Sequence, residues 1–168
     1  MPSAWARFCR RAGRSNLIPA VAIALGSNLG DREAYLRAAL DAIRPHVDSL
    51  RSSSFHDTAP VGVGEQPIFL NAAAVGETLL SARALLVTLL DIEKRLGRER
   101  PYPGAPRTLD LDLILYDDEI IDSPDLVVPH PRFRERRFVL EPLAEIAGDW
   151  RDPLTGRTVS ELLAVLSA

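Results

Sequence analysis

The sequence predicts an α+β fold in which two helices pack on one sheet of four strands, in the chain order β-α-β-β-α-β. Two segments repeat apolar residues at helical spacing, and the segments around them are short, apolar or alternating, as strands are. With 168 residues, 46% of them apolar and 26% charged, the chain has the composition of one globular domain. This composition excludes a disordered, collagen-like or disulfide-dense protein.

The first strand and the first helix are expected within the first 50 residues. Residues 20–25 form an unbroken apolar run, A-V-A-I-A-L, which predicts a buried strand. A glycine-containing turn from Gly26 to Gly30 breaks this run, and Asp31 can cap the helix that follows. Pro45 marks the end of that helix. Its apolar stripe consists of Leu36, Leu40, Ile43 and Val47.

The next two strands are expected on either side of a loop. Residues 52–58 look extended, and residues 68–75 are mainly apolar and predict a strand. The loop between them, residues 59–67, contains two prolines and two glycines, which disfavour regular structure. We therefore expect two strands joined by an irregular loop.

A second helix is expected from Ser81 to the residue before Gly97, because glycine is favoured just after a helix. Its apolar stripe consists of Leu85, Leu89, Ile92 and Leu96. The loop of residues 98–108 then leads to a last strand, residues 109–116, whose alternation predicts leucines on one face and acids on the other. The leucines are Leu109, Leu111, Leu113 and Leu115, and the acids are Asp110 and Asp112.

The completed order is that of a ferredoxin-like α+β sandwich. From Asp122 onward we expect a C-terminal extension that ends in a short helix near residues 159–166. Residues 20–168 are expected to form a single domain. The leader, residues 1–19, is rich in arginine and contains no acid, and we expect it to be a disordered extension. A loose match to an organelle transit peptide is the alternative.

Several function classes are excluded by composition. Cys9 is the one cysteine, so no internal disulfide and no cysteine-rich zinc site is possible. No run of 18 apolar residues occurs, and the sequence pI near 5.6 disfavours a general nucleic-acid binder. We therefore expect a cytoplasmic protein with no membrane and no nucleic-acid partner.

The sharpest chemical feature is the pair of carboxylates Asp110 and Asp112. Positions i and i+2 of a strand project from the same face, about 7 Å apart along the chain. Carboxylates this close repel each other, and a divalent cation relieves the repulsion. Oxygen ligands of this kind suit Mg²⁺, which binds one or two carboxylates together with substrate phosphates. The alternative is an ordinary solvated strand face.

Arginines surround this pair in the sequence, and guanidinium groups bind phosphate oxygens through paired hydrogen bonds. Carboxylates for metal and arginines for phosphate are the groups that phosphoryl transfer requires. His130, between two prolines, either donates to a phosphate or caps a turn, whereas His46 and His56 lack supporting neighbours. Arg132 and Arg134 are expected to be surface residues. The arginines on either side of the pair are Arg98, Arg100, Arg107, Arg132, Arg134, Arg136 and Arg137.

An amide and two aromatic rings indicate a second binding surface. Asn71 lies inside an apolar strand, where an amide is unfavourable unless it is paired. Such an amide can bind the donor and acceptor edge of a flat heterocycle, and Phe69 and Phe138 could enclose the ring. The alternative is a buried asparagine bonded to backbone, beside two core phenylalanines.

Five blocks of sequence resemble one known family, the 6-hydroxymethyl-7,8-dihydropterin pyrophosphokinases of folate biosynthesis. They occur in the family's order and together span most of residues 20–147. The blocks are A-L-G-S-N-L-G-D (24–31), T-A-P-V-G-V-G-E-Q-P-I-F-L-N-A-A (58–73), E-K-R-L-G-R-E-R (93–100), P-R-T-L-D-L-D-L-I-L-Y (106–116) and V-P-H-P-R-F-R-E-R-R-F-V-L-E-P-L (128–143).

The resemblance implies transfer of pyrophosphate from ATP to the pterin hydroxymethyl group, with AMP released. It also implies that Asp110 and Asp112 hold two Mg²⁺ ions and, with Arg98 and Arg107, form the catalytic set. The positions that align with ATP contacts are Glu93, Arg98, Arg100, Arg107, His130 and Arg136. Those that align with pterin contacts are Thr58, Val61, Phe69, Asn71 and Phe138. We expect the two small-molecule substrates to be its partners and the chain to be a monomer.

The chain also departs from the family's pattern. The family often has proline at Ala59, glycine at Ala105 and tyrosine at Phe69. The loop from Arg100 to Arg107 is short and lacks the arginine–tryptophan pair of some members. We still expect this loop to be a mobile lid that closes over both substrates.

Two other functions compete with this interpretation. A ferredoxin-like module that binds RNA would present aromatic residues and basic charge on its sheet, whereas the face of Asp110 and Asp112 is acidic. A metal-dependent nucleotidyltransferase would also use paired acids, but it would release inorganic pyrophosphate rather than AMP.

Overall fold

The computed structural model describes residues 18–60, 64–99 and 101–167, and it confirms the predicted order of strands and helices. Most of the expected leader lies outside the described residues. The elements in chain order are β1 (Ala20–Ser27), α1 (Arg32–Ile43), β2 (Asp48–Ser52), β3 (His56–Thr58), β4 (Phe69–Glu77), α2 (Ala82–Arg95), β5 (Asp110–Tyr116), β6 (Ile121–Ser123), β7 (Leu126–Val128), the 3-10 helix η2 (Phe133–Glu135), α3 (Arg137–Ala147) and α4 (Val159–Ser167).

The main sheet has the strand order β2-β4-β1-β5, with β3 also paired to β4, and every pairing is antiparallel. The expected strand 52–58 is shorter in the structure, where β3 covers only its last three residues, and β2 is an earlier strand that ends at Ser52; residues 53–55 form a link between the two. At Ser53 the backbone N–H donates to the Ala73 carbonyl at 2.8 Å, while the Ser53 hydroxyl accepts from the Ala73 N–H at 2.9 Å. The serine side chain thus takes the place of a backbone carbonyl, which interrupts the regular ladder.

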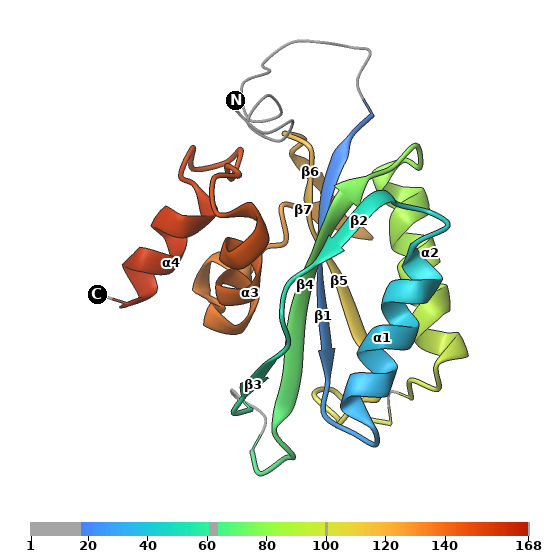
Figure 1. The fold of residues 1–168 in the computed structure, drawn as a ribbon. Helices are drawn as coiled ribbons and strands as arrows, with labels where there is room; N and C mark the ends of the chain where they lie inside the picture. Colours follow the sequence, from blue (N-terminus) through green and yellow to red (C-terminus); the bar gives the residue numbers. More distant parts are fainter. Residues whose placement is uncertain (1–17, 61–63, 100, 168) are drawn as a thin grey trace.

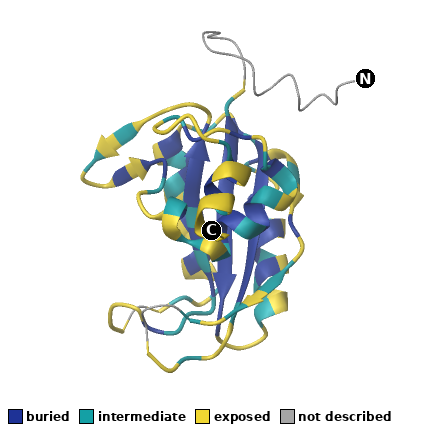
Figure 2. Cartoon of the chain, turned by 90° about the vertical axis from the view of Figure 1, so that its left-hand side faces the viewer, coloured by how far each residue is buried: buried dark blue, intermediate teal, exposed yellow. Residues whose placement is uncertain are grey.

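Helices cover both faces of this sheet, α1 and α2 on one side and α3 and α4 on the other (Figure 1). The side chains of β1 alternate between the two layers, with Val21, Ile23 and Leu25 facing α1 and α2. Ala20, Ala22 and Ala24 face α3. The strands at the centre of the sheet are therefore buried on both sides, as the dark ribbons of Figure 2 show.

Helix α3 is not anticipated by the sequence analysis, which describes residues 128–140 only as part of an extension. Pro142 lies inside this helix, where a proline removes one backbone hydrogen bond and disfavours helical structure in isolation. Tertiary packing compensates, because Leu140 and Leu143 are buried against the alanines of the sheet. Small side chains on this face of the sheet let the helix lie close to it.

Strand β5 contains a bulge that corrects one expected orientation. Leu113 pairs with Ile23 and Leu115 with Ala22, so Ile114 is an extra residue. As a result Leu115 lies in the α3-side core, whereas Leu109, Leu111 and Leu113 lie in the α1- and α2-side core. Both acids precede the bulge and therefore keep the orientation predicted for them, on the face opposite these three leucines.

The C-terminal extension packs on the α3 side, and its expected terminal helix is α4. Asp152 is fully buried and binds the Arg134 guanidinium at 2.6 and 2.8 Å, so Arg134 stabilises the extension. Among the helices of the described ranges, none is both long and apolar enough to cross a membrane.

Candidate active site

The candidate site lies on the α3 side of the sheet, where polar residues of β4 and β5 lie in one row on either side of a glycine of β1. Asn71 of β4 and Asp110 of β5 both pair with Gly26 of β1. A Cβ atom added to Gly26 would lie 2.9 Å from Oδ1 of Asn71. Any larger residue at position 26 would therefore crowd the Asn71 amide. Glycine leaves room for this amide beside the Asp110 carboxylate.

The two carboxylates differ in their partners. Asp110 accepts hydrogen bonds from Nη1 of Arg98 at 2.5 Å and from Nη1 of Arg107 at 3.4 Å. Asp112 has a looser ion pair, with Nη1 of Arg136 at 4.0 Å. Burial raises the pKa of Asp112 to about 7; the Asp110 charge adds to this rise, and Arg136 opposes it. Asp112 is thus the carboxylate whose charge is less well compensated.

Glu93 and Arg98 connect the end of α2 to β5. Oε1 of Glu93 accepts from Nη1 of Arg98 at 2.8 Å and from the Leu111 N–H at 2.7 Å. Both side chains are buried, with 4% of Glu93 and 7% of Arg98 exposed. The Glu93 carboxylate therefore holds Arg98 against Asp110. The resemblance alone does not specify this supporting role of Glu93.

Asn28, which is 1% exposed, joins the loops on either side of the site. Its backbone N–H donates to the Arg107 carbonyl at 3.0 Å, and its Oδ1 accepts from the Arg107 N–H at 2.8 Å. Its Nδ2 donates to Oε1 of Gln66 at 2.9 Å, and Gln66 in turn donates to the Gly104 carbonyl at 2.7 Å. The position of Arg107 is thus fixed by Asn28.

The residues expected to bind a heterocycle lie beside this row. Nδ2 of Asn71 donates to the Thr58 hydroxyl, which is on the neighbouring strand β3. The Arg107 guanidinium lies 5.3 Å from the centre of the Phe69 ring, and the Arg136 guanidinium lies 5.6 Å from the centre of the Phe138 ring. Each ring is therefore next to an arginine expected to bind phosphate. Val61 and Arg100 lie outside the described residues.

His130 joins the site from the segment before η2. Its N–H donates to the Ile114 carbonyl at 2.9 Å, and its Nδ1 accepts from the Arg132 N–H at 3.2 Å. Burial, and after it the Arg136 cation, lower the pKa of His130 to about 4. The ring is therefore neutral at pH 7, and because Nδ1 accepts, Nε2 carries the proton. This histidine caps a turn and keeps Nε2 as a donor.

The described residues contain no group of three or more histidine, cysteine, aspartate or glutamate side chains placed to hold a metal ion. Asp110 and Asp112 offer carboxylate oxygens alone. This donor set fits Mg²⁺, which commonly binds one or two carboxylates and takes its other ligands from water and substrate phosphates.

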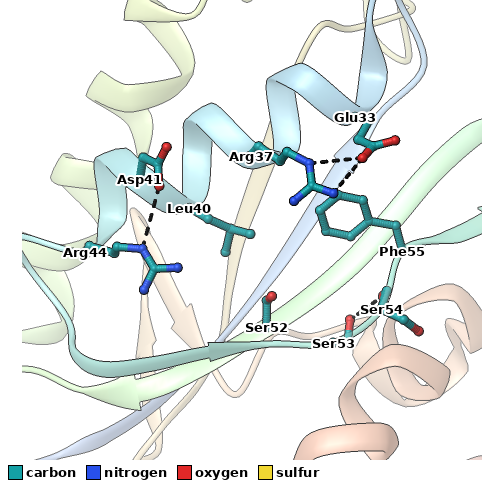
Figure 3. Close-up of a pocket in the computed structure, with 9 residues that line it drawn as sticks. All are labelled: Glu33, Arg37, Leu40, Asp41, Arg44, Ser52, Ser53, Ser54 and Phe55. Atoms are coloured by element: carbon teal, nitrogen blue, oxygen red, sulfur yellow. Dashed lines mark hydrogen bonds and ion pairs between the residues drawn. The ribbon is translucent and has the colours of Figure 1, made fainter.

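A hollow of about 520 Å³ lies elsewhere, between α1 and the link between β2 and β3 (Figure 3). Arg37 is paired with Glu33 at 2.6 Å, and Arg44 is 3.6 Å from Asp41. None of the predicted site residues lines it. Because the charges that line it are already paired along α1, nothing in this hollow indicates a ligand.

Three residues make contacts that their local sequence does not indicate. Gly26 and Asn28 belong to the G-S-N-L-G segment, which by itself is a weak phosphate-binding pattern. The role of Gly26 depends on its pairing with Asn71, and that of Asn28 on its hydrogen bonds to Arg107. The expectation that His56 has no supporting neighbour is wrong. Its Nε2 lies 3.2 Å from Oγ of Ser54 and 3.5 Å from Oε1 of Glu145. Only the tertiary packing of α3 brings these groups together.

The site combines paired carboxylates, arginines beside them, and an adjacent amide with aromatic rings. This combination defines a phosphate-transferring enzyme built on a ferredoxin-like sheet. Residues 22–148 match the family model described as 7,8-dihydro-6-hydroxymethylpterin-pyrophosphokinase. The chain belongs to this family.

Named relatives agree with this match. The 2-amino-4-hydroxy-6-hydroxymethyldihydropteridine pyrophosphokinase of Bacillus subtilis is 49% identical over 126 residues, which are 74% of this chain and 75% of that protein. The protein of the same name from Pseudomonas aeruginosa is 42% identical over 150 residues, 88% of this chain and 92% of that one.

Solved structures support the fold. The HPPK-DHPS protein of Plasmodium falciparum superposes with a TM-score of 0.72 at 13% identity. The match covers 91% of this chain and 45% of that one. At this identity the likeness establishes the ferredoxin-like fold and no more.

Proposed function

We propose that this chain transfers the pyrophosphoryl group of ATP to the hydroxymethyl oxygen of 6-hydroxymethyl-7,8-dihydropterin, giving the pterin diphosphate and AMP, a step of folate biosynthesis. The observation that carries the proposal is the row of Asn71, Gly26 and Asp110 in a member of the pyrophosphokinase family. It puts the group suited to a heterocycle and the group suited to metal and phosphate on one face of the sheet.

In this reaction the hydroxymethyl oxygen attacks the β-phosphorus of ATP, and the bond from that phosphorus to the α,β-bridging oxygen breaks. AMP leaves with the bridging oxygen, and the hydroxyl proton is released. No protein nucleophile is needed, so catalysis rests on positioning and on stabilising charge. Arg98 and Arg107 are pre-positioned for this by Glu93 and Asn28.

Asp110 and Asp112 are the residues that would hold Mg²⁺, two ions in this proposal. When bound, the metal neutralises negative charge on the phosphates and helps to align them. The Asp112 carboxylate, whose pKa is raised by burial and by Asp110, has the stronger need for a cation. Asp110 is already bonded to Arg98 and Arg107, which orients its carboxylate.

Substrate recognition in this proposal divides between two sets of residues. The pterin edge is bound by Asn71, whose amide is oriented by Thr58, and the pterin ring lies against Phe69 and Phe138, with Val61 from the adjacent loop. ATP is bound by Arg98, Arg100, Arg107, His130 and Arg136, with Glu93 in support. We further propose that the chain acts as a monomer in the cytoplasm.

The test is an assay of the purified chain with ATP, the dihydropterin and Mg²⁺, in which both AMP and inorganic pyrophosphate are followed. We expect AMP to form in equal amount to the pterin diphosphate, and neither to form when EDTA replaces Mg²⁺. Release of pyrophosphate with a nucleotidylated product would instead identify a nucleotidyltransferase. Full activity in EDTA would overturn the metal assignment while leaving the reaction in place.

A further inference from the structure

A polar cluster at the edge of the sheet lies outside the residues assigned above. Glu145, near the end of α3, accepts two hydrogen bonds from Ser54 in the link between β2 and β3. The Ser54 N–H donates to Oε2 and the Ser54 hydroxyl donates to Oε1, both at 2.5 Å. His56 completes the cluster, with Nε2 3.5 Å from Oε1 of Glu145. These bonds connect elements separated by 91 residues in the chain.

Serine, histidine and glutamate together suggest hydrolytic catalysis, but the geometry excludes it. In a triad the histidine lies between serine and acid and uses a different ring nitrogen for each. Here the same Nε2 faces both Ser54 and Glu145, and the serine hydroxyl donates directly to the carboxylate. The carboxylate therefore acts as a hydrogen-bond acceptor that holds Ser54.

Both ends of this contact lead to the pterin-binding residues. Glu145 follows Phe138 by seven residues of α3, a spacing that places them on one side of the helix. On the sheet, His56 pairs with Asn71 and Thr58 pairs with Phe69. The cluster therefore connects α3, which carries Phe138, to the strands β3 and β4, which carry Phe69 and Asn71.

The link that carries Ser54 is a firm point of attachment. Ser53 is 5% exposed and bonds to β4 through both its N–H and its hydroxyl. Phe55, on the opposite side of Ser54, lies 5.4 Å from the Arg37 guanidinium of α1. Figure 3 shows Ser53, Ser54 and Phe55 one after another along the link, below α1. A helix bonded to Ser54 is thus bonded to a fixed part of the sheet.

We propose that Glu145 is a positioning residue for the pterin substrate: its bonds to Ser54 hold α3 against β3 and so set the separation of Phe138 from Asn71 and Phe69. This inference rests on the proposed function and assigns to it a residue that lies away from the reacting groups. Arg98 and Arg107 are held by Glu93 and Asn28 instead, whereas Arg136 is the N-cap of α3. ATP binding should therefore depend on this contact less than pterin binding does.

The test compares Glu145→Ala with Glu141→Ala, a matched control on the same helix. Glu141 has its ion pair within α3, with Arg137 at 3.5 Å, and alanine favours a helix at either position. The measurements are KM for the dihydropterin, KM for ATP, kcat, and affinity for the dihydropterin in the presence of a non-hydrolysable ATP analogue. Ser54→Ala and Glu145→Gln, which each keep part of the contact, complete the series.

We expect Glu145→Ala to weaken dihydropterin binding roughly three- to tenfold, as expected for loss of charge-assisted hydrogen bonds at a half-exposed site. KM for ATP should rise less than KM for the dihydropterin, because Arg98 and Arg107 do not depend on α3. Glu141→Ala should match the wild type, and Ser54→Ala and Glu145→Gln should fall between. Equal pterin affinity in Glu145→Ala and Glu141→Ala would overturn the proposal, as would parallel losses for both substrates. A wild-type chain that forms no pterin diphosphate would refute the proposed function itself, before any variant is compared.

Discussion

Asp110 and Asp112 are two residues apart on one strand, yet their surroundings give them different parts in the molecule. We expect Asn at either position to reduce pyrophosphoryl transfer at least roughly 100-fold, because one charge-stabilising contact contributes about 2.7 kcal/mol or more to catalysis. AMP formation at saturating ATP and Mg²⁺ measures this. Asp118→Asn, in the exposed turn after β5, is the control and should keep full activity. Near-full activity in both site variants would mean that the acids are ordinary surface residues.

The same two substitutions should differ in their effect on stability. Asp110→Asn leaves the buried Arg98 guanidinium with less charge compensation, so we expect a loss of about 2 kcal/mol in the free energy of unfolding. Asp112→Asn removes a charge that burial and Asp110 disfavour, so stability should stay level or rise. Urea denaturation without metal measures both. Destabilisation by Asp112→Asn equal to that by Asp110→Asn would contradict the difference in their partners.

His130 gives the fold a dependence on pH. Its pKa is about 4 in the folded chain, below the ordinary value of 6.5, because burial and Arg136 disfavour the imidazolium. Between these values the unfolded chain binds more protons, so the stability due to neutral His130 is complete above pH 6.5 and declines as the pH falls toward 4. We expect urea denaturation at pH 7 and pH 5 to show a smaller decline for His130→Asn than for the wild type. Equal declines would show that His130 does not titrate in this way.

At the scale of the elements, the sequence predicts local structure better than it predicts pairing. The alternation of Leu109 to Leu113 with two acids identifies β5 and the face of the acids correctly, because strand periodicity is a local property. The bulge at Ile114 is not visible in that pattern, since it depends on how β5 pairs with β1. Helix α3 escapes prediction for a related reason. Pro142 weakens its local signal, and β1 and β4, against which it packs, end at Ser27 and Glu77, far earlier in the chain.

The loops that border the site are connected by Asn28, and this makes their movement testable. Exchange of the Gly104 and Ala105 amides should slow when the dihydropterin and a non-hydrolysable ATP analogue bind, if residues 100–107 close as a lid. In Asn28→Ala the same amides should exchange faster in the empty protein, because Arg107 and Gln66 lose their bonds to Asn28. Hydrogen exchange followed by mass spectrometry measures both effects.

Gln66→Ala is the graded comparison for Asn28→Ala, because it removes the bond to the Gly104 carbonyl and leaves the bonds between Asn28 and Arg107 intact. We expect its exchange rates to lie between those of the wild type and Asn28→Ala. Exchange at Gly104 and Ala105 that responds neither to the ligands nor to Asn28→Ala would show that these loops are not coupled through Asn28.

At the scale of the whole molecule, one face of the sheet serves both packing and function. Its first part, lined by alanines of β1 and β4, is covered by α3, and its continuation carries Gly26, Asn71 and Asp110. Residue types and spacing predict that the two acids share one face of a strand, which the structure confirms, whereas the roles of the acids, the arginines and the amide stay predictions. The contacts of Glu93 and Asn28 that hold the arginines join separate elements of the chain and therefore could not be predicted from local patterns.

Two backbone hydrogen bonds hold the residues at the start of β1. The Pro19 carbonyl accepts from the Thr78 N–H at 3.0 Å, and the Ala20 carbonyl accepts from the Asp117 N–H at 2.6 Å. A chain that begins at Ile18 keeps both bonds, so we expect it to melt and turn over like the full chain. A chain that begins at Ala20 loses the Pro19 carbonyl and should be less stable by about 1 kcal/mol, without loss of kcat. Thermal melts and the AMP assay compare the three chains. Lower activity in the chain from Ile18 would show that residues 1–17 contribute to the domain.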